Sequence, residues 1–310
     1  MEIWFLGTGA GRPMKHRNVT SIALRLPDPD CSLWMFDAGE GTQHQLMHTP
    51  LKLNKLEVLF VTHLHGDHTY GIPGLLSTRS YVGGNSPLKL FGPPGIREMI
   101  ETALTLSGTH LDYEITYHEV SEGIIYQTER YTVEALPLEH RVPCFGYRIT
   151  ECESPGKLNV ELLQQLGVPA GPLFGRIKKG EDITLPDGTL IRSADVTGTP
   201  ACGRVIAIAG DTKPCDNAFR LAQNADLLVH EATFAAGQEE KAHLYGHSTT
   251  VEAATTARDA NAKRLIMTHF STRFVDEDLA VLEEEARAIF PNSSAAHDLY
   301  HTEVPRAARD

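Results

Sequence analysis

The stretch that decides the fold is VLFVTHLHGDH, residues 58–68, in which an apolar run ends at a cluster of histidines and an aspartate. The run from Val58 to Val61 is bounded by polar residues and predicts a buried strand. His63 and His65 are two positions apart, so their side chains point to the same side of an extended chain. The strand is therefore predicted to deliver both imidazoles to one edge of a sheet.

A turn at Gly66 brings a second pair of side chains to a neighbouring point, because glycine tolerates sharp backbone bends. Asp67 and His68 follow directly. Imidazole nitrogen and carboxylate oxygen suit zinc, and two diverging pairs predict two adjacent metal ions. Solvated loop histidines are the alternative in a chain with 15 histidines. Four ligand-type residues in six positions, directly after a buried strand, favour the metal site.

Length and composition indicate a globular protein of one large or two ordinary domains. The chain has 310 residues, of which 41% are hydrophobic, enough for a sizeable core. No run approaches the roughly 18 apolar residues of a membrane span. The opening MEIWFL lacks the basic lead-in of a signal peptide. We therefore expect a first strand there, a cytoplasmic protein and no membrane partner.

Charge and cysteine usage narrow the function classes. The formal net charge of −12 argues against a nucleic-acid partner unless basic residues cluster locally. The five cysteines are odd in number and form no Cys-x-x-Cys pair. This pattern disfavours both a disulfide framework and a thiolate zinc site.

Ligand-type side chains follow short apolar strands at five points of the chain. These residues are His63, His140, Asp211, His230 and His269. Strand ends that share one edge of a sheet are where α/β sites gather, so we expect these residues to converge. Strands alternate with helices in two halves of the chain. This order predicts two sheets packed face to face with helices outside.

Further elements are expected between these strands. We expect helices near residues 42–48, 69–80, 94–106, 158–166, 215–223, 250–260 and 277–288. His243, Tyr245 and His247 are expected in a loop before the helix at 250. Asp37 ends a strand at 33–36, and two interpretations stay open for it. It either orients a ligand histidine from the outer shell or is an acid at a helix N-terminus.

Two loops near the N-terminus and one later segment have unusual composition. The turn GTGAG, residues 7–11, could cradle a phosphate or form a tight turn. The loop from Pro13 to Asn18 carries two cations and could equally be a solvated loop. Residues 151–195 predict an insertion between core segments 1–150 and 196–310. Arg176, Lys178 and Lys179 lie in it as three cations, with no acid among residues 156–160 or 167–180, although a solvated hairpin is the alternative.

With these residues in place, the chain resembles the ribonuclease Z family of the metallo-β-lactamase superfamily. Residues 63–68 match the His-x-His-x-Asp-His motif, Pro13 to Asn18 match the Pro-x-Lys-x-Arg-Asn loop, and Gly171-Pro172 match the Gly-Pro arm. Further matches are FLGTG at 5–9, FDAGE at 36–40, His140, GDT at 210–212, HEAT at 230–233, HSTT at 247–250 and TH at 268–269. The resemblance implies an α/β fold, a four-layer αβ/βα sandwich with an inserted arm at 151–195.

The resemblance also implies a zinc-dependent endoribonuclease that removes the 3′ trailer from precursor tRNA. It implies two zinc ions per subunit, no organic cofactor and a homodimer. The implied metal ligands are His63, His65, His140 and Asp211 for one ion, and Asp67, His68, Asp211 and His269 for the other. Asp67 would also accept a proton from the attacking water, and His247 with Glu231 would protonate the leaving 3′ oxygen. The implied substrate-binding residues are Lys15, Arg17, Asn18, Gly171, Pro172, Arg176, Lys178 and Lys179.

Two other functions compete with this one. A superfamily hydrolase of a small phosphodiester, aryl sulfate or lactone would share the metal site, but it gives no reason for the basic arm. An RNA-binding protein with structural metals is disfavoured, because closed structural zinc sites are typically rich in cysteine. Comparing activity on precursor tRNA and on small esters separates the first two.

Overall fold

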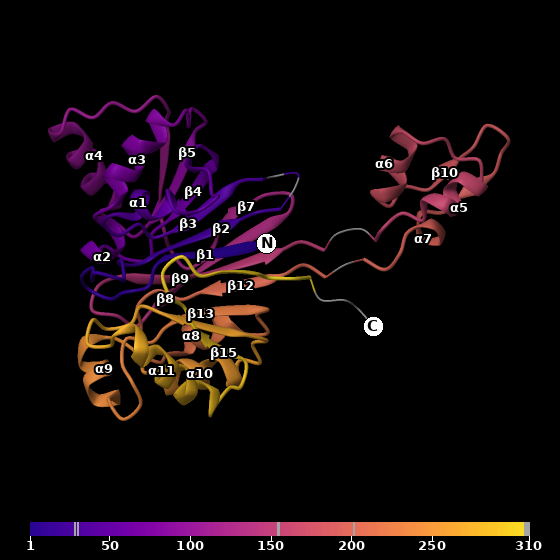
Figure 1. The fold of residues 1–310 in the computed structure, drawn as a ribbon. Helices are drawn as coiled ribbons and strands as arrows, with labels where there is room; N and C mark the ends of the chain where they lie inside the picture. Colours follow the sequence, from indigo (N-terminus) through magenta and orange to yellow (C-terminus); the bar gives the residue numbers. More distant parts are fainter. Residues whose placement is uncertain (28, 30, 154–155, 201, 307–310) are drawn as a thin grey trace. The chain divides into compact units, whose positions relative to one another are not determined.

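The computed structural model describes residues 1–27, 29, 31–153, 156–200 and 202–306. They divide into two compact units (Figure 1). Unit 1 comprises Met1–Gln127, Val133–Ile149 and Val205–Val304, and unit 2 comprises Thr128–Thr132, Thr150–Arg204 and Pro305–Asp310. Most of the predicted insertion falls in unit 2, although Ser154 and Pro155 lie outside the described residues. Its role as a separate arm stays a prediction.

Unit 1 contains the first of two seven-stranded sheets, with the strand order β16-β1-β2-β3-β4-β5-β6. Its strands are β1 (Glu2–Gly7), β2 (Ser21–Arg25), β3 (Leu33–Phe36), β4 (Leu56–Phe60), β5 (Leu88–Gly92), β6 (Ile115–Glu119) and β16 (His301–Glu303). Strands β3 to β6 run parallel, so their carboxyl ends share one edge. The THLHGDH stretch leaves β4 at this edge.

The second sheet has the order β15-β14-β13-β12-β9-β8-β7. Its strands are β7 (Gly123–Gln127), β8 (Tyr131–Leu138), β9 (Cys144–Glu151), β12 (Val205–Ile208), β13 (Leu227–Glu231), β14 (Leu265–Thr268) and β15 (Ser293–Ala295). Strands β12 to β15 are parallel. The segments that follow β12 and β14 therefore start at one edge of this sheet.

The inner faces of the two sheets meet through aromatic side chains. Phe60 of β4 lies 5.2 Å from Tyr147 of β9 between ring centroids, and the Tyr147 hydroxyl donates to the Val61 carbonyl at 2.6 Å. Burying an aromatic ring with its hydroxyl satisfied stabilises such a layer. The two sheets are thereby held face to face.

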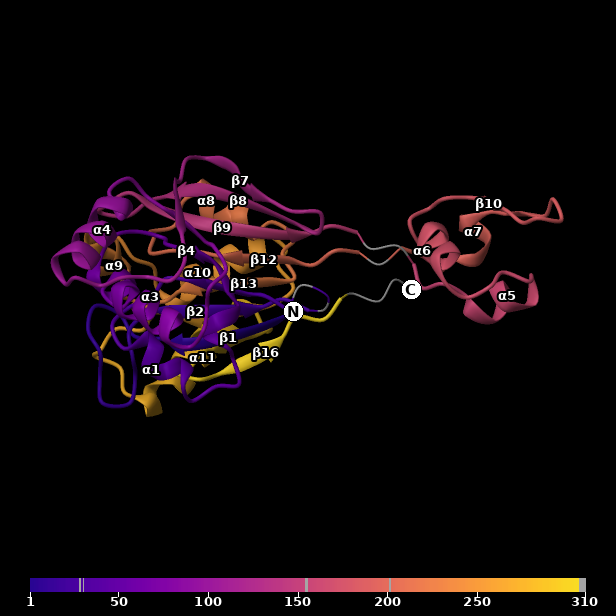
Figure 2. The same ribbon diagram turned by 90° about the horizontal axis from the view of Figure 1, so that it is seen from above.

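Helices cover the outer faces, which confirms the predicted four-layer sandwich (Figures 1 and 2). Helices α1, α3 and α4 pack on the first sheet through residues such as Leu75 and Ile100. Helices α8, α10 and α11 pack on the second through residues such as Ala254 and Leu282. The helices of unit 1 are α1 (Thr42–Leu46), α2 (Gly66–Thr69), α3 (Ile72–Tyr81), α4 (Ile96–Leu106), α8 (Asp216–Ala222), α9 (Glu239–Tyr245), α10 (Thr250–Asp259) and α11 (Leu279–Arg287), with 3₁₀ turns at Leu53–Lys55 and Asp276–Asp278. None of the described helices is both long and apolar enough to cross a bilayer.

The prediction of a loop around His243 and Tyr245 is wrong, because both residues belong to helix α9. Two acids, Glu239 and Glu240, occupy its first turn, where they complement the helix dipole. Gly246 ends the helix with φ at 82°, a conformation that glycine adopts readily. His247 therefore begins the segment beyond a helix end.

Unit 2 has a small core of its own. Its elements are α5 (Val160–Gln165), α6 (Pro172–Lys178), α7 (Ser193–Val196), β10 (Ile183–Thr184) and β11 (Leu190–Ile191). Gly171-Pro172 begins α6, where proline is favoured at the first helical position. Leu163, Ile177 and Ile191 belong to the buried cluster. The segment thus has a packed core of short helices and one antiparallel strand pair, β10–β11, and is not a solvated hairpin alone.

A buried ion-pair cluster in unit 2 links the two ends of the segment Thr150–Arg204 to each other and to Arg306. Glu151 is 3% exposed and accepts from Arg204 Nε at 2.7 Å and from Arg306 Nη2 at 2.6 Å. Burial alone would raise the pKa of Glu151, but its bonds to the two guanidinium groups lower it to about 2. The carboxylate therefore stays charged and holds these segments together at neutral pH.

Candidate metal centre

The seven predicted metal ligands of unit 1 converge at the carboxyl ends of the strands. His63 and His65 lie beyond β4, and Asp67 and His68 begin α2. Asp211 lies beyond β12, and the other two residues, His140 and His269, follow β8 and β14. The prediction of convergence fails only for His230. That side chain is part of β13 and completely buried, with Nδ1 2.7 Å from the Glu231 carbonyl.

One set of four ligand atoms comes from His63, His65, His140 and Asp211, all within 4.8 Å of one another. His63 Nε2 lies 2.9 Å from His65 Nδ1, and His140 Nε2 lies 3.3 Å from the same atom. Ligands at the roughly 2.0–2.1 Å zinc–nitrogen distance in a tetrahedral site are themselves roughly 3.3 Å apart. This spacing fits a shared metal ion.

A second set comes from Asp67, His68 and His269. His269 Nε2 lies 3.4 Å from Asp67 Oδ2 and 3.2 Å from His68 Nε2. Asp211 adjoins both sets, because its carboxylate lies 3.6 Å from His63 Nε2 and 3.6 Å from His68 Nε2. The structure thus places Asp211 where one carboxylate can serve two metal ions.

Hydrogen bonds to the second ring nitrogens fix how these histidines point. His68 Nδ1 lies 2.7 Å from Asp37 Oδ2, and His140 Nδ1 lies 2.7 Å from the Gly246 carbonyl. His269 Nδ1 lies 2.9 Å from Thr233 Oγ1. Each bond leaves the Nε2 atom facing the centre, which is the arrangement of metal-ligating histidines. The donor set therefore fits zinc.

Asp37 acts on the centre from outside it. Its carboxylate also accepts from the Thr62 backbone amide and hydroxyl, both at 2.7 Å. It is not the N-terminal acid of α1, whose first turn carries no acid. Of the two open interpretations, the structure supports the outer-shell one.

The charge state of Asp211 suits metal binding. Burial by itself would raise the pKa of Asp211, but His269, His68 and His63 around it hold that pKa well below the usual range. The group is therefore a carboxylate at neutral pH. A buried carboxylate without a compensating cation would be costly, so the centre favours bound cations.

His247 and Glu231 form a pair at the rim of the centre. His247 Nδ1 lies 3.0 Å from Glu231 Oε1, and Glu231 also accepts from the Ser248 and Thr233 amides. Burial disfavours charge on the imidazole, but the Glu231 carboxylate outweighs it and raises the pKa of His247 to about 9. The imidazole is thus oriented by a fixed carboxylate and can hold a proton at neutral pH.

In the predicted substrate-binding loop from Pro13 to Asn18, one residue, Arg17, is buried and does not face solvent. Lys15 is exposed. Arg17 is 2% exposed and bonds to Asp276 Oδ1 at 2.8 Å and to the Phe274 carbonyl at 3.1 Å. Its guanidinium is therefore committed to other protein groups. We interpret Arg17 as a residue that holds the loop, with Lys15 as the cation that faces solvent.

Asp298 organises this loop and was missed by sequence analysis. One oxygen accepts from the Thr8 amide and hydroxyl at 3.0 and 2.9 Å, and the other accepts from the Asn18 amide at 2.6 Å and Gln45 Nε2 at 2.8 Å. Beyond the same turn, the Gly11 amide donates to Asp67 Oδ2 at 2.6 Å. The chain around Asp298 carries no motif that marks it, so only the fold reveals this role.

We expect Asp298→Asn to lower the turnover of a reaction at this centre about tenfold, because the new amide group would face donors where an acceptor is needed. One unsatisfied buried polar group costs about 1–3 kcal/mol. Steady-state kinetics beside Asp259→Asn, an exposed control, would measure the loss. Unchanged kinetics would show that the loop keeps its position without this carboxylate.

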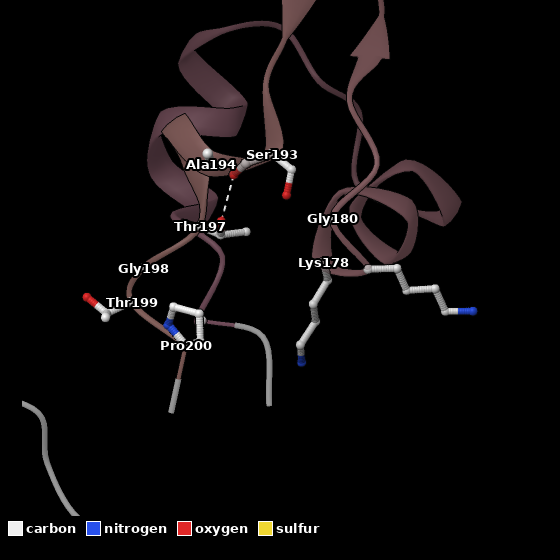
Figure 3. Close-up of a pocket in the computed structure, with 10 residues that line it drawn as sticks. Lys178, Gly180, Ser193, Ala194, Thr197, Gly198, Thr199 and Pro200 are labelled. Carbon is white, nitrogen blue, oxygen red and sulfur yellow. Dashed lines mark hydrogen bonds between the residues drawn. The ribbon is translucent and has the colours of Figure 1, made fainter. Parts of the chain in front are cut away.

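The remaining predicted residues lie in unit 2, where two of them, Lys178 and Lys179, line a pocket of about 500 Å³ (Figure 3). Lys178 and Lys179 line it together with Ser193 and Thr197. Both lysines are exposed, whereas Arg176 pairs with Glu181 at 2.7 Å. Gly171 and Pro172 are exposed at the start of α6. The pocket therefore presents two ammonium groups beside hydroxyl and backbone groups.

Comparison with known proteins gives matches over nearly the whole chain to two relatives and one solved structure, and over its first half to one family model. The chain is 51% identical over 306 residues to ribonuclease Z of Bacillus licheniformis, covering 99% of this chain and 100% of that protein. It is 50% identical over 306 residues to ribonuclease Z of Geobacillus kaustophilus, with coverage of 99% and 100%. The crystal structure of the short form of human tRNase Z aligns with a TM-score of 0.71 and 31% identity, covering 98% of this chain and 100% of that one. A family model described as anti-Pycsar protein Apyc1 matches residues 1–151.

Proposed function

The chain belongs to the ribonuclease Z family, and from this membership we propose that it is a metal-dependent endoribonuclease that removes the 3′ trailer from precursor tRNA. The observation that carries the proposal is the convergence of two adjacent ligand sets, which meet at Asp211, beside the His247–Glu231 pair. We also propose that the enzyme acts in the cytoplasm. The products are a tRNA with a 3′ hydroxyl and a trailer with a 5′ phosphate.

We infer two zinc ions as the resident metals. His63, His65, His140 and Asp211 would hold one ion. Asp67, His68, Asp211 and His269 would hold the other. Bound zinc supplies charge that stabilises a developing phosphorane and lowers the pKa of water.

The side chains then divide the proton transfers. Asp67 lies 3.4 Å from His269 Nε2, where its carboxylate can accept a proton from the attacking water. His247 Nδ1 donates to Glu231, which stabilises the charged imidazole, and the opposite ring nitrogen, Nε2, donates its proton to the 3′ oxygen as the phosphodiester bond breaks. The fixed Glu231 carboxylate stabilises the charged imidazole beforehand, so donation needs no rearrangement.

Binding of the RNA is assigned to the basic pocket and the exposed loop. In the pocket of unit 2, Lys178 and Lys179 offer ammonium groups to phosphates, and the backbone of Gly198 lies nearby (Figure 3). Lys15 offers a further cation in unit 1. Cations that contact phosphates bind folded RNA through its shape without reading its sequence. This reconciles an acidic protein with a nucleic-acid substrate.

We also propose that the enzyme is a homodimer. Met47 after α1 is 77% exposed and Tyr81 at the end of α3 is 89% exposed, and Met47 and Val82 line a cavity of about 320 Å³. Exposed apolar side chains that gather in one place are typical of contact surfaces. Light scattering should give twice the 34.1 kDa chain mass, and Met47→Glu with Tyr81→Glu should give the monomer. A monomeric wild-type protein would contradict the proposal.

Mapping the cut ends tests the reaction directly. The metal-loaded protein would be incubated with a precursor tRNA that carries a 3′ trailer, beside a chelated control. A single metal-dependent cut after the acceptor stem, leaving a 3′ hydroxyl, is expected. No cut, with hydrolysis of a small phosphodiester retained, would instead favour a small-molecule hydrolase.

Excising the helical part of unit 2 should separate RNA binding from chemistry. The Gly198 amide donates to the Lys157 carbonyl at 2.8 Å, so two glycines can replace residues 158–197. All residues of the buried cluster of unit 2 lie within the excised segment. We expect precursor cleavage to fall at least about 100-fold, because charged hydrogen bonds contribute about 1.5–3 kcal/mol each. Hydrolysis of bis(p-nitrophenyl) phosphate should persist.

A pair of charge-matched variants refines the excision. Lys178→Ala with Lys179→Ala should weaken precursor cleavage, whereas Arg97→Ala with Lys263→Ala removes the same charge from exposed positions of unit 1 and should not. Equal losses from both pairs would mean that net charge alone is responsible.

A further inference from the structure

Two planar side chains flank His247 on one side of the centre, and the mechanism above does not use them. Tyr245 stacks on Phe234 with ring centroids 6.4 Å apart and planes inclined by 10°. Arg273 lies over the same ring, with Cζ 5.6 Å from its centroid. Phe234 itself lies 6.1 Å from the His247 ring. The three groups form a stack whose base adjoins the proton donor.

The backbone holds this stack firmly beside the centre. The Phe234 amide donates to the Ser248 carbonyl at 3.2 Å, and the Thr250 amide donates to the Phe234 carbonyl at 3.0 Å. Tyr245 is the last residue of α9, and the next carbonyl, that of Gly246, lies 2.7 Å from His140 Nδ1. A shift of Tyr245 would therefore disturb a metal ligand, so its position relative to the centre is fixed.

Exposure distinguishes this stack from ordinary core packing. Phe234 is 4% exposed, whereas Tyr245 is 43% exposed and Arg273 is exposed. Tyr245 and Arg273 each cover Phe234 with part of their own surface, and the rest of their own surface is open to solvent. Aromatic rings and arginine planes open in this way are the groups on which unpaired nucleobases stack.

The position of the leaving oxygen identifies which nucleobase would contact Tyr245 and Arg273. His247 donates its proton to the leaving 3′ oxygen, and that oxygen belongs to the nucleotide on the 5′ side of the cut. Resting on the proposed function, we propose that Tyr245 and Arg273 form a stacking subsite for the base of that nucleotide. Stacking on a ring face tolerates every base, so the subsite positions the scissile phosphate without selecting a sequence.

A double-mutant cycle between protein and substrate tests this contact. One precursor would lack the base on the 5′ side of the cut, and a second would lack the base on the 3′ side. With the precursor that lacks the 5′ base, the missing base alone should reduce kcat/KM about tenfold, and so should Tyr245→Leu on the intact precursor. The two changes combined should reduce kcat/KM no further than the larger single loss. With the precursor that lacks the 3′ base, the losses in kcat/KM from Tyr245→Leu and from the missing base should multiply, because Tyr245 does not contact the 3′ base. Tyr245→Leu keeps apolar cover over Phe234, and Tyr245→Phe should match the wild type.

Controls keep the outcomes distinct. Leu244→Ala alters a neighbouring residue of α9 that is 73% exposed, and it should leave cleavage unchanged. Arg273→Lys keeps the charge but loses the plane, so it should show the same non-multiplicative pattern as Tyr245→Leu. Losses that multiply for the 5′ base would overturn the subsite while leaving the proposed function intact. Failure of the wild type to cut any precursor would overturn both.

Discussion

Asp211→Asn is expected to abolish most of the activity, with a loss on the order of 10³–10⁴-fold in kcat. The Asp211 carboxylate lies within 4.0 Å of nitrogen atoms of His63, His68, His140, His247 and His269. Its replacement removes the charge that both metal positions share. Metal charge contributes several kcal/mol to such transition states, and each 1.36 kcal/mol is tenfold in rate. Metal analysis of the dialysed protein should show fewer than two ions per chain.

The control for this variant is Asp259→Asn, which removes the same charge from an exposed pair with Arg258. It should retain two metal ions and full activity. If Asp211→Asn kept both ions and cleaved precursor normally, the shared-carboxylate interpretation would be wrong. Added zinc in excess separates weak binding from lost chemistry, since restored occupancy without restored turnover assigns a direct role to the carboxylate.

The sheets and the metal ligands could be predicted because they depend on local patterns. Val58 to Val61 is apolar and β-branched, and the ligand residues stand directly behind such runs. In the second sheet, parallel strands that share an edge then bring Asp211 and His269 together, although 58 positions separate them. The same reasoning fails for His230, because the strand β13 continues through it and turns its side chain into the protein. A one-residue difference at a strand end reverses the direction of a side chain.

Features that depend on tertiary contacts could not be predicted. Arg17 is a cation in a polar loop, yet it is buried because Asp276 and the Phe274 carbonyl come to it from distant parts of the chain. Asp298 binds four donors from three segments, and no short-range pattern marks it. Helix α9 also depends on tertiary contacts, because Ala242 is the residue that packs inward, and Gly246 ends the helix.

His247→Ala is expected to lower kcat on precursor tRNA by about 10²–10⁴-fold, the usual contribution of a positioned general acid. The imidazole holds its proton at neutral pH because Glu231 stabilises the charged form, which raises the pKa of His247 to about 9. A substrate whose leaving 3′ oxygen is replaced by sulfur needs little protonation, because a thiolate leaves readily. We therefore expect the variant to cleave this substrate at nearly the wild-type rate, and single-turnover kinetics would measure both rates.

Glu231→Gln should lower kcat on the oxygen substrate less than His247→Ala does. The glutamine can still orient the His247 ring, although it stabilises the charge of the ring less. His48→Ala removes an exposed histidine of unit 1 and serves as the matched control with no loss. His247→Ala could instead cleave the sulfur substrate as poorly as the oxygen substrate. That result would assign His247 to metal or phosphate binding, because only a proton donor becomes dispensable when the leaving group needs no proton. The ratio of the two losses is thus the quantity that decides the role, because a folding defect would reduce both rates alike.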